Sequence, residues 1–115
     1  MRVRSTYFKV QDVAGAVTFW RSLLQLAPVK EATHWAEFLI GEVRLGLLLN
    51  DFGETISGNS TVPVLELEPS ELKAFVERAK SLGATTVIDG LENPKMNSIV
   101  MAAPTGHEFE LCNCR

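Results

Sequence analysis

Cysteine is scarce in this 115-residue sequence, where only Cys112 and Cys114 occur. The two lie at the end of a strand-like segment, and residues two apart on a strand project to the same face. That geometry is poor for a mutual disulfide. We therefore expect reduced thiols and a cytoplasmic protein. A zinc site is not favoured either, because no second thiol pair accompanies this one.

The sequence also lacks an excess of positive charge, long apolar runs and low-complexity segments. Its net charge is −3 and its Lys and Arg residues are dispersed, which argues against a nucleic-acid partner. No apolar run approaches the roughly 18 residues of a membrane span. The beginning of the chain alternates like a strand and does not form the apolar block of a signal peptide. We expect a soluble folded domain, since 46% of the residues are hydrophobic and 22% charged.

What the sequence does contain is an order of elements, one strand, one helix and three strands, that occurs twice. In the first copy Asp12 is placed to cap a helix, and Pro28 follows the helical segment. In the second copy Pro69 suits a first helical turn and Gly83 suits a helix end. Both helices carry apolar residues at the spacing of an amphipathic helix: Ala16, Phe19, Trp20 and Leu23, then Leu72, Phe75, Val76 and Ala79.

Alternating or apolar segments predict the strands at residues 3–10, 29–32, 35–40, 43–49, 62–67, 84–88, 98–103 and 108–112. The sequence therefore predicts one α+β domain, residues 1–115, built of two βαβββ modules. The modules cover about 1–50 and 61–115, and a polar loop at 51–60 joins them. Pairing two such units buries sheet faces that a single unit would leave exposed.

The segment 104–111 is the most informative for chemistry. Pro104 and Gly106 are turn residues, and the strand that follows places Phe109 on one face and Glu110 on the other. Glu110 therefore points away from the apolar layer and is the first candidate for site chemistry. The alternative is a glutamate on a solvated face, because Glu is mostly exposed in proteins.

Two parts of the chain resemble the vicinal oxygen chelate superfamily, which includes glyoxalase I, extradiol dioxygenases, fosfomycin-resistance enzymes and bleomycin-binding proteins. One part is residues 7–13 leading into 16–24, and the other is 104–111, which resembles the ending Pro-x-Gly-x-x-x-Glu-Leu of that superfamily. The resemblance implies that the two modules form a curled mixed sheet around a ligand cup, the glyoxalase/bleomycin-resistance/dioxygenase fold. It also implies a homodimer, because short chains of this superfamily commonly combine.

The same resemblance bears on metal binding. In metal-dependent relatives the last-strand glutamate is a ligand, and it maps onto Glu110. The other ligand positions fall on Ser5, near Gly46 and near Val62, none of which replaces His or Glu as a ligand. A catalytic divalent ion needs about three protein ligands. The two histidines do not replace the missing ligands, because His107 has the opposite strand parity to Glu110 and His34 lies between strands. We therefore expect no metal. A divalent metal is the alternative cofactor.

The resemblance to bleomycin-binding proteins implies a metal-free protein that sequesters or senses a small organic ligand, with antibiotic resistance among the implied roles. The residues expected to line its cup are Ser5, Tyr7, Lys9, Glu66 and Glu110. The alternative is a glyoxalase- or dioxygenase-like lyase or oxidoreductase, with Glu110 as metal ligand or acid–base group. A partner-binding module without a small ligand is a third reading. The sequence favours a non-catalytic role, because no other catalytic grouping occurs in it.

Overall fold

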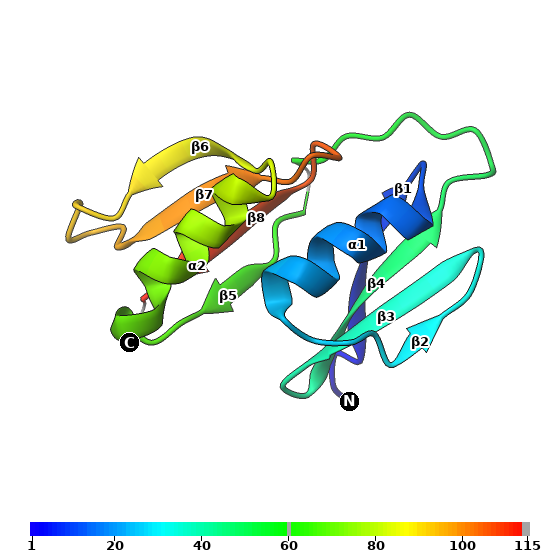
Figure 1. The fold of residues 1–115 in the computed structure, drawn as a ribbon, viewed down its shortest axis with the longest axis horizontal. Coiled ribbons are helices and arrows are strands. Elements are labelled where there is room, and N and C mark those ends of the chain that lie inside the picture. Colours follow the sequence, from blue (N-terminus) through cyan, green and yellow to red (C-terminus); the bar gives the residue numbers. More distant parts are fainter. Residues whose placement is uncertain (60, 114–115) are drawn as a thin grey trace. The chain divides into compact units, whose positions relative to one another are not determined.

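The computed structural model describes residues 1–59 and 61–113 and divides into two compact units, Met1–Ile56 and Ser57–Arg115. Each unit contains one helix and one four-stranded sheet (Figure 1). The predicted pair of βαβββ modules is therefore confirmed.

The first unit contains the elements β1 (Ser5–Val10), α1 (Val13–Leu24), β2 (Lys30–Glu31), β3 (Trp35–Ile40) and β4 (Val43–Leu49). The order in the sheet is β1-β4-β3-β2, so the first and last strands of the unit are neighbours. They pair in parallel, whereas the other pairs are antiparallel. Side chains of β1, β4 and β3 that share a register position consequently lie together on one face of the sheet.

The second unit repeats this arrangement with the elements β5 (Val64–Glu66), α2 (Pro69–Ser81), β6 (Thr85–Gly90), β7 (Ser98–Ala102) and β8 (Glu108–Cys112). The order is β5-β8-β7-β6, again with a parallel first pair and two antiparallel ones. A register shift interrupts the β6–β7 pair between Thr86 and Ile88. The helix α2 lies over one face of this sheet (Figure 1).

The helix α1 forms where the sequence predicts it. The Asp12 side chain accepts a hydrogen bond from the Gly15 backbone N–H at 3.1 Å, which satisfies one of the free donors of the first turn. The helix ends at Leu24, before Pro28. The next residue, Gln25, adopts the left-handed conformation with φ of 56° and donates its N–H to the Arg21 carbonyl.

The apolar stripe of α1 covers one face of the first sheet. Trp20 is 1% exposed and stacks on Phe8 of β1, with ring centroids 5.8 Å apart. Phe19 meets Trp20 edge to face at 5.3 Å. Trp20 therefore belongs to the core of the first unit. Because Phe8 points toward α1, its neighbours Tyr7 and Lys9 point to the opposite face.

The second core follows the same alternation. Phe109 and Leu111 of β8 are fully buried, and Phe75 and Ala79 of α2 are buried as well. Glu110 lies between Phe109 and Leu111 and is partly exposed. The predicted strand parity of this segment is confirmed.

The expectation for Cys112 is wrong. Cys112 is disulfide-bonded, whereas Cys114 lies outside the described residues. A disulfide is disfavoured only where strand geometry continues through both cysteines, and β8 ends at Cys112. A cytoplasmic location therefore loses the support of reduced thiols and remains a prediction.

The described helices are 12 and 13 residues long, and no helix in this part of the chain has the length and apolar character that crossing a bilayer requires.

Candidate functional site

The face of the first sheet opposite α1 combines aromatic and charged side chains. We term it the site face; its residues are Ser5, Tyr7 and Lys9 of β1, Trp35 and Glu37 of β3, and Arg44, Gly46 and Leu48 of β4. The strand register brings them together, because Tyr7 and Glu37 are both Cα partners of Gly46. Apolar residues between them, such as Ala36 and Leu47, are fully buried.

Trp35 and Tyr7 form the aromatic part of the site face. Their rings meet edge to face, with centroids 5.6 Å apart and an angle of 73° between planes. The indole of Trp35 lies against Gly46, where an added Cβ would be 2.2 Å from the ring atom Cη2. Only glycine leaves room for the ring in this position. Tyr7 remains 49% exposed, so its ring is accessible to a ligand.

Glu37 forms the charged part of the site face. It is only 2% exposed, which is unusual for a glutamate. Its Oε1 accepts a hydrogen bond from Trp35 Nε1 at 2.9 Å, and its Oε2 lies 3.1 Å from Arg44 Nε. Arg4, just before β1, approaches Oε1 more loosely, with Nη1 3.8 Å away. These contacts compensate the buried carboxylate, which would otherwise be strongly destabilising.

The same contacts lower the pKa of Glu37 below its usual value of 4.5. The hydrogen bond from Trp35 is the largest cause, and the positive charges of Arg4, Lys30 and Arg44 act in the same direction. Burial acts in the opposite direction, because it disfavours the charged form. Glu37 therefore stays ionised at neutral pH and holds the indole and the guanidinium in place.

Lys9 is engaged by the loop after β4. Its Nζ donates to Glu54 Oε2 and lies 5.4 Å from the centre of the Phe52 ring. The hydrogen bond to Glu54 raises the pKa of Lys9. The loop is held in turn by Asn50, whose Nδ2 donates to the Glu54 carbonyl at 2.7 Å. The charge of Lys9 is thus already balanced by a carboxylate.

The two predicted carboxylates lie in the second unit. Glu110 of β8 and Glu66 of β5 share one sheet face, because Glu110 is the partner of Val64 and Glu66 is the partner of Cys112. Glu110 is partly exposed and Glu66 is exposed. Within residues 1–59 and 61–113 the Glu110 carboxylate forms no hydrogen bond or ion pair. It is therefore available to a ligand or a proton.

The structure thus brings Ser5 and Tyr7 together with Lys9 on one sheet, and Glu66 with Glu110 on the other. Sequence reasoning missed Glu37 and Arg44. A signal for Glu37 exists in the alternation of Trp35 and Glu37 with Ala36 and Phe38, the same pattern that identified Glu110. No comparable signal shows that the carboxylate is buried, because that depends on partners from three segments.

The donor set does not fit a catalytic divalent ion. Among the residues that the structure describes, no three His, Cys, Asp or Glu side chains gather. Trp35 fills the space next to Gly46, and Ser5 is the register partner of Arg44, whose positive charge repels a cation. The predicted lack of a metal cofactor nevertheless remains a prediction.

The two histidines have contacts of their own. His107 is 4% exposed, and its Nδ1 is 2.7 Å from Thr105 Oγ1. His34 is exposed, with Nε2 3.8 Å from Asp51 Oδ2.

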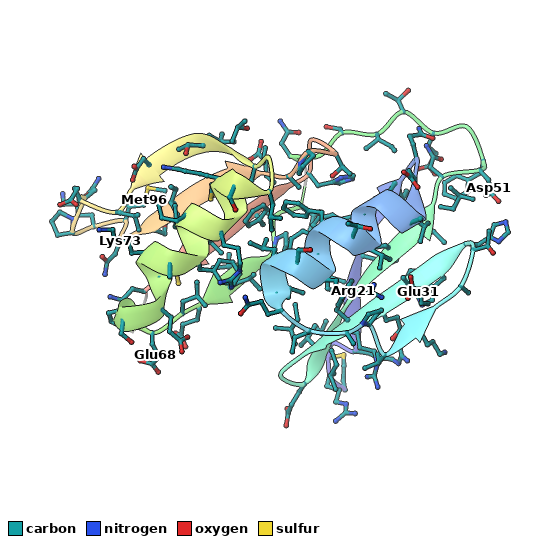
Figure 2. The ribbon with its side chains drawn as sticks, in the orientation of Figure 1. Arg21, Glu31, Asp51, Glu68, Lys73 and Met96 are labelled. Atoms are coloured by element: carbon teal, nitrogen blue, oxygen red, sulfur yellow. The ribbon has the colours of Figure 1, made fainter. Side chains whose placement is uncertain are left out.

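Two other features of the first unit lie outside the site face. A hollow of about 390 Å³ is lined mainly by the start of α1 and the turn after β2, including Asp12, Val17 and Thr33. An exposed ion pair joins Arg21 of α1 to Glu31 of β2, with Nη2 3.0 Å from Oε1 (Figure 2). Neither feature contains a residue predicted to bind ligand.

Known proteins share the sequence pattern and the fold of this chain. Residues 5–112 match the sequence pattern of the glyoxalase-like domain. No curated protein matches the chain at a significant level.

Solved structures resemble the fold at low sequence identity. A glyoxalase-related enzyme from Fulvimarina pelagi has a TM-score of 0.78 and 18% identity, over 96% of this chain and 86% of that one. A glyoxalase/bleomycin resistance protein/dioxygenase family enzyme from Burkholderia phytofirmans PsJN has a TM-score of 0.80 and 15% identity, over 96% and 97%. The fosfomycin resistance protein FosX from Mesorhizobium loti has a TM-score of 0.72 and 17% identity, over 100% and 91%. At these identities the similarity establishes the fold and leaves the chemistry to the site.

Proposed function

The chain belongs to the glyoxalase-like domain family, and from this membership we propose that it is a metal-free protein that sequesters or senses a small organic molecule. The observation that carries the proposal is the indole of Trp35 against Gly46. This ring covers Gly46, near which the superfamily resemblance implies a metal ligand in metal-dependent relatives, and with Tyr7 it supplies an aromatic surface. Aromatic side chains with a few polar groups are typical of small-molecule sites.

The predicted ligand-binding residues remain Ser5, Tyr7, Lys9, Glu66 and Glu110. Tyr7 is the best supported of them, because its ring is half exposed beside Trp35. Lys9 has its charge balanced by Glu54, so we assign it a role through its aliphatic stem. Glu110 supplies a carboxylate in the second unit that has no partner among the described residues.

An enzyme is the second candidate, and the Glu110 carboxylate favours it. A partly exposed carboxylate without a partner among the described residues can transfer a proton or contribute one metal ligand. Relatives of this fold are described as enzymes, as in the Fulvimarina pelagi protein. In this case the protein would act as a glyoxalase- or dioxygenase-like lyase or oxidoreductase.

A thermal-shift screen with acidic, neutral and basic small molecules, run with and without added Mn, Fe, Ni and Zn, tests the proposal. We expect at least one compound class to raise the melting temperature without metal, and elemental analysis to find no stoichiometric ion. Tyr7→Ser should abolish the shift. Val29→Ser is the matched control, because Val29 is similarly exposed, at 53%, and lies outside the site face.

Three outcomes would overturn the proposal. The first is a tightly bound ion in each chain. The second is turnover that Glu110→Gln slows while ligand binding is retained, which would favour the enzyme. The third is a library without any hit, which would reject small-molecule binding altogether.

A further inference from the structure

The surroundings of the Glu37 carboxylate carry more positive than negative charge. Around the buried carboxylate of Glu37 lie three cations, Arg4, Lys30 and Arg44. Within the described residues neither arginine has a second carboxylate partner, and Lys30 has none within 4 Å. Three positive charges against one negative charge leave a net charge of +2 at this place. This local sign is opposite to that of the whole chain, which carries −3.

Arg44 is the cation best placed to bind a ligand. Its Nε faces Glu37 at 3.1 Å, which orients the planar guanidinium from one side. Its side chain is still 31% exposed, and among the described residues Glu37 is its only ion-pair partner. An arginine oriented in this way presents a fork of N–H donors, which suits a carboxylate. Arg4 is less restrained, with 57% exposure and a contact of 3.8 Å.

An aromatic surface lies beside this guanidinium. In the β1–β4 register Arg44 pairs with Ser5, and the next positions on the same face are Gly46 and Tyr7. Trp35 covers Gly46 and contacts the Tyr7 ring edge to face. The Glu37 carboxylate accepts the Trp35 N–H and forms an ion pair with Arg44, so one buried group orients the aromatic part and the cationic part together.

We infer that Arg44, oriented by Glu37, binds the carboxylate of a small organic acid whose flat apolar body lies against Tyr7. The inference rests on the proposed function and deepens it by naming the ligand class. It assigns the choice of ligand charge to Arg44 in the first unit, whereas the sequence singled out Glu110 as the first candidate for site chemistry.

Benzoate and phenylacetate, with benzamide and phenylacetamide as uncharged counterparts, are suitable probes. The readout is the Trp35 Nε1–H resonance in a proton–nitrogen correlation NMR spectrum, because this group donates to Glu37. It is distinguished from Trp20 by a Trp35→Phe variant. We expect the acids to shift this resonance in a saturable way below about 5 mM, and the amides to leave it unchanged.

Arg44→Gln should weaken binding of the acids about tenfold or more, the effect of losing a charged hydrogen-bond donor. Arg44→Lys should weaken it less, since the charge is kept and only the fork is lost. Arg21→Gln is the matched control, because it removes the same charge from an ion-paired arginine outside the site face.

The inference is overturned if acids and amides bind equally, if Arg44→Gln binds like the unaltered protein, or if the acids do not bind. Should Arg44→Gln fail to fold, the comparison of acids with amides in the unaltered protein still tests the inference. Hits limited to amines or neutral compounds in the broader thermal-shift screen would refute this ligand class and leave the proposed function intact. A broad screen without hits would refute both.

Discussion

At the scale of single residues, Glu37 connects most of the polar contacts on the site face. Its carboxylate is buried, accepts the Trp35 indole N–H and lies against Arg44. Buried charges in proteins are retained only with partners, and removing one partner is costly. The residue therefore affects both the stability of the first unit and the position of its ligand-facing groups.

We predict that stability depends on the ionisation of Glu37. Its pKa is lower in the folded chain than its usual value of 4.5, so the folded state favours the charged form. The resulting stabilisation is complete above pH 4.5 and is lost as the pH falls through the folded-state pKa. Urea unfolding measured between about pH 3 and pH 7 should show a decline on the acid side of 4.5.

Glu37→Gln is the control for this pH dependence. The variant should be less stable at neutral pH by about 2 kcal/mol, because Arg44 and Trp35 lose a charged acceptor. Its free energy of unfolding should also decrease less steeply with falling pH than that of the unaltered protein. Parallel pH profiles for the two proteins would contradict the assignment to Glu37.

At the scale of elements, α1 and its cap hold β1 in position. The helix buries the Phe8 side of that strand, and the other side presents Tyr7 to the site face. The start of the helix depends on Asp12, which accepts from the Gly15 N–H. In α2 the cap residue Glu68 forms no such side-chain bond, and Pro69 occupies the first turn instead.

We predict that Asp12→Ala destabilises the protein by about 1 kcal/mol, because a helix N–H loses its acceptor. Asp12→Asn is the matched control and should retain most of the stability, since its side-chain oxygen can accept the same bond. Urea unfolding at neutral pH measures both. Equal stability of the two variants would mean that the cap contributes little.

At the scale of the whole molecule, the outer strand β6 bears on assembly. Within residues 1–59 and 61–113 it pairs only with β7, and its Val87 and Ile88 are 46% and 53% exposed. Exposed strands with apolar side chains are prone to association, and natural proteins usually protect them. This exposure is compatible with the homodimer that the superfamily resemblance implies.

We predict that the protein is a homodimer in solution. Sedimentation equilibrium should give twice the chain mass of 12.7 kDa, about 25 kDa. A dilution series is the control, because a reversible dimer dissociates at low concentration whereas a monomer does not change. A mass of one chain at all concentrations would contradict the prediction.

The sequence by itself determined the order of elements, the caps and the alternation of strand faces. These depend on local chemistry: Asp12 before an apolar stripe, Pro69 in a first turn, and Phe109 alternating with Glu110. The resemblance carried by residues 7–24 and 104–111 added the family, which the match over residues 5–112 confirms.

Only the tertiary structure decided where the charged centre of the first unit lies. Glutamate is usually exposed, so nothing in the local pattern indicates that Glu37 is buried. Its burial requires an indole from its own strand and guanidinium groups from two other segments, and it requires Gly46 beneath that indole. These contacts follow from the β1–β4–β3 pairing, because strand register joins residues that are far apart in the chain.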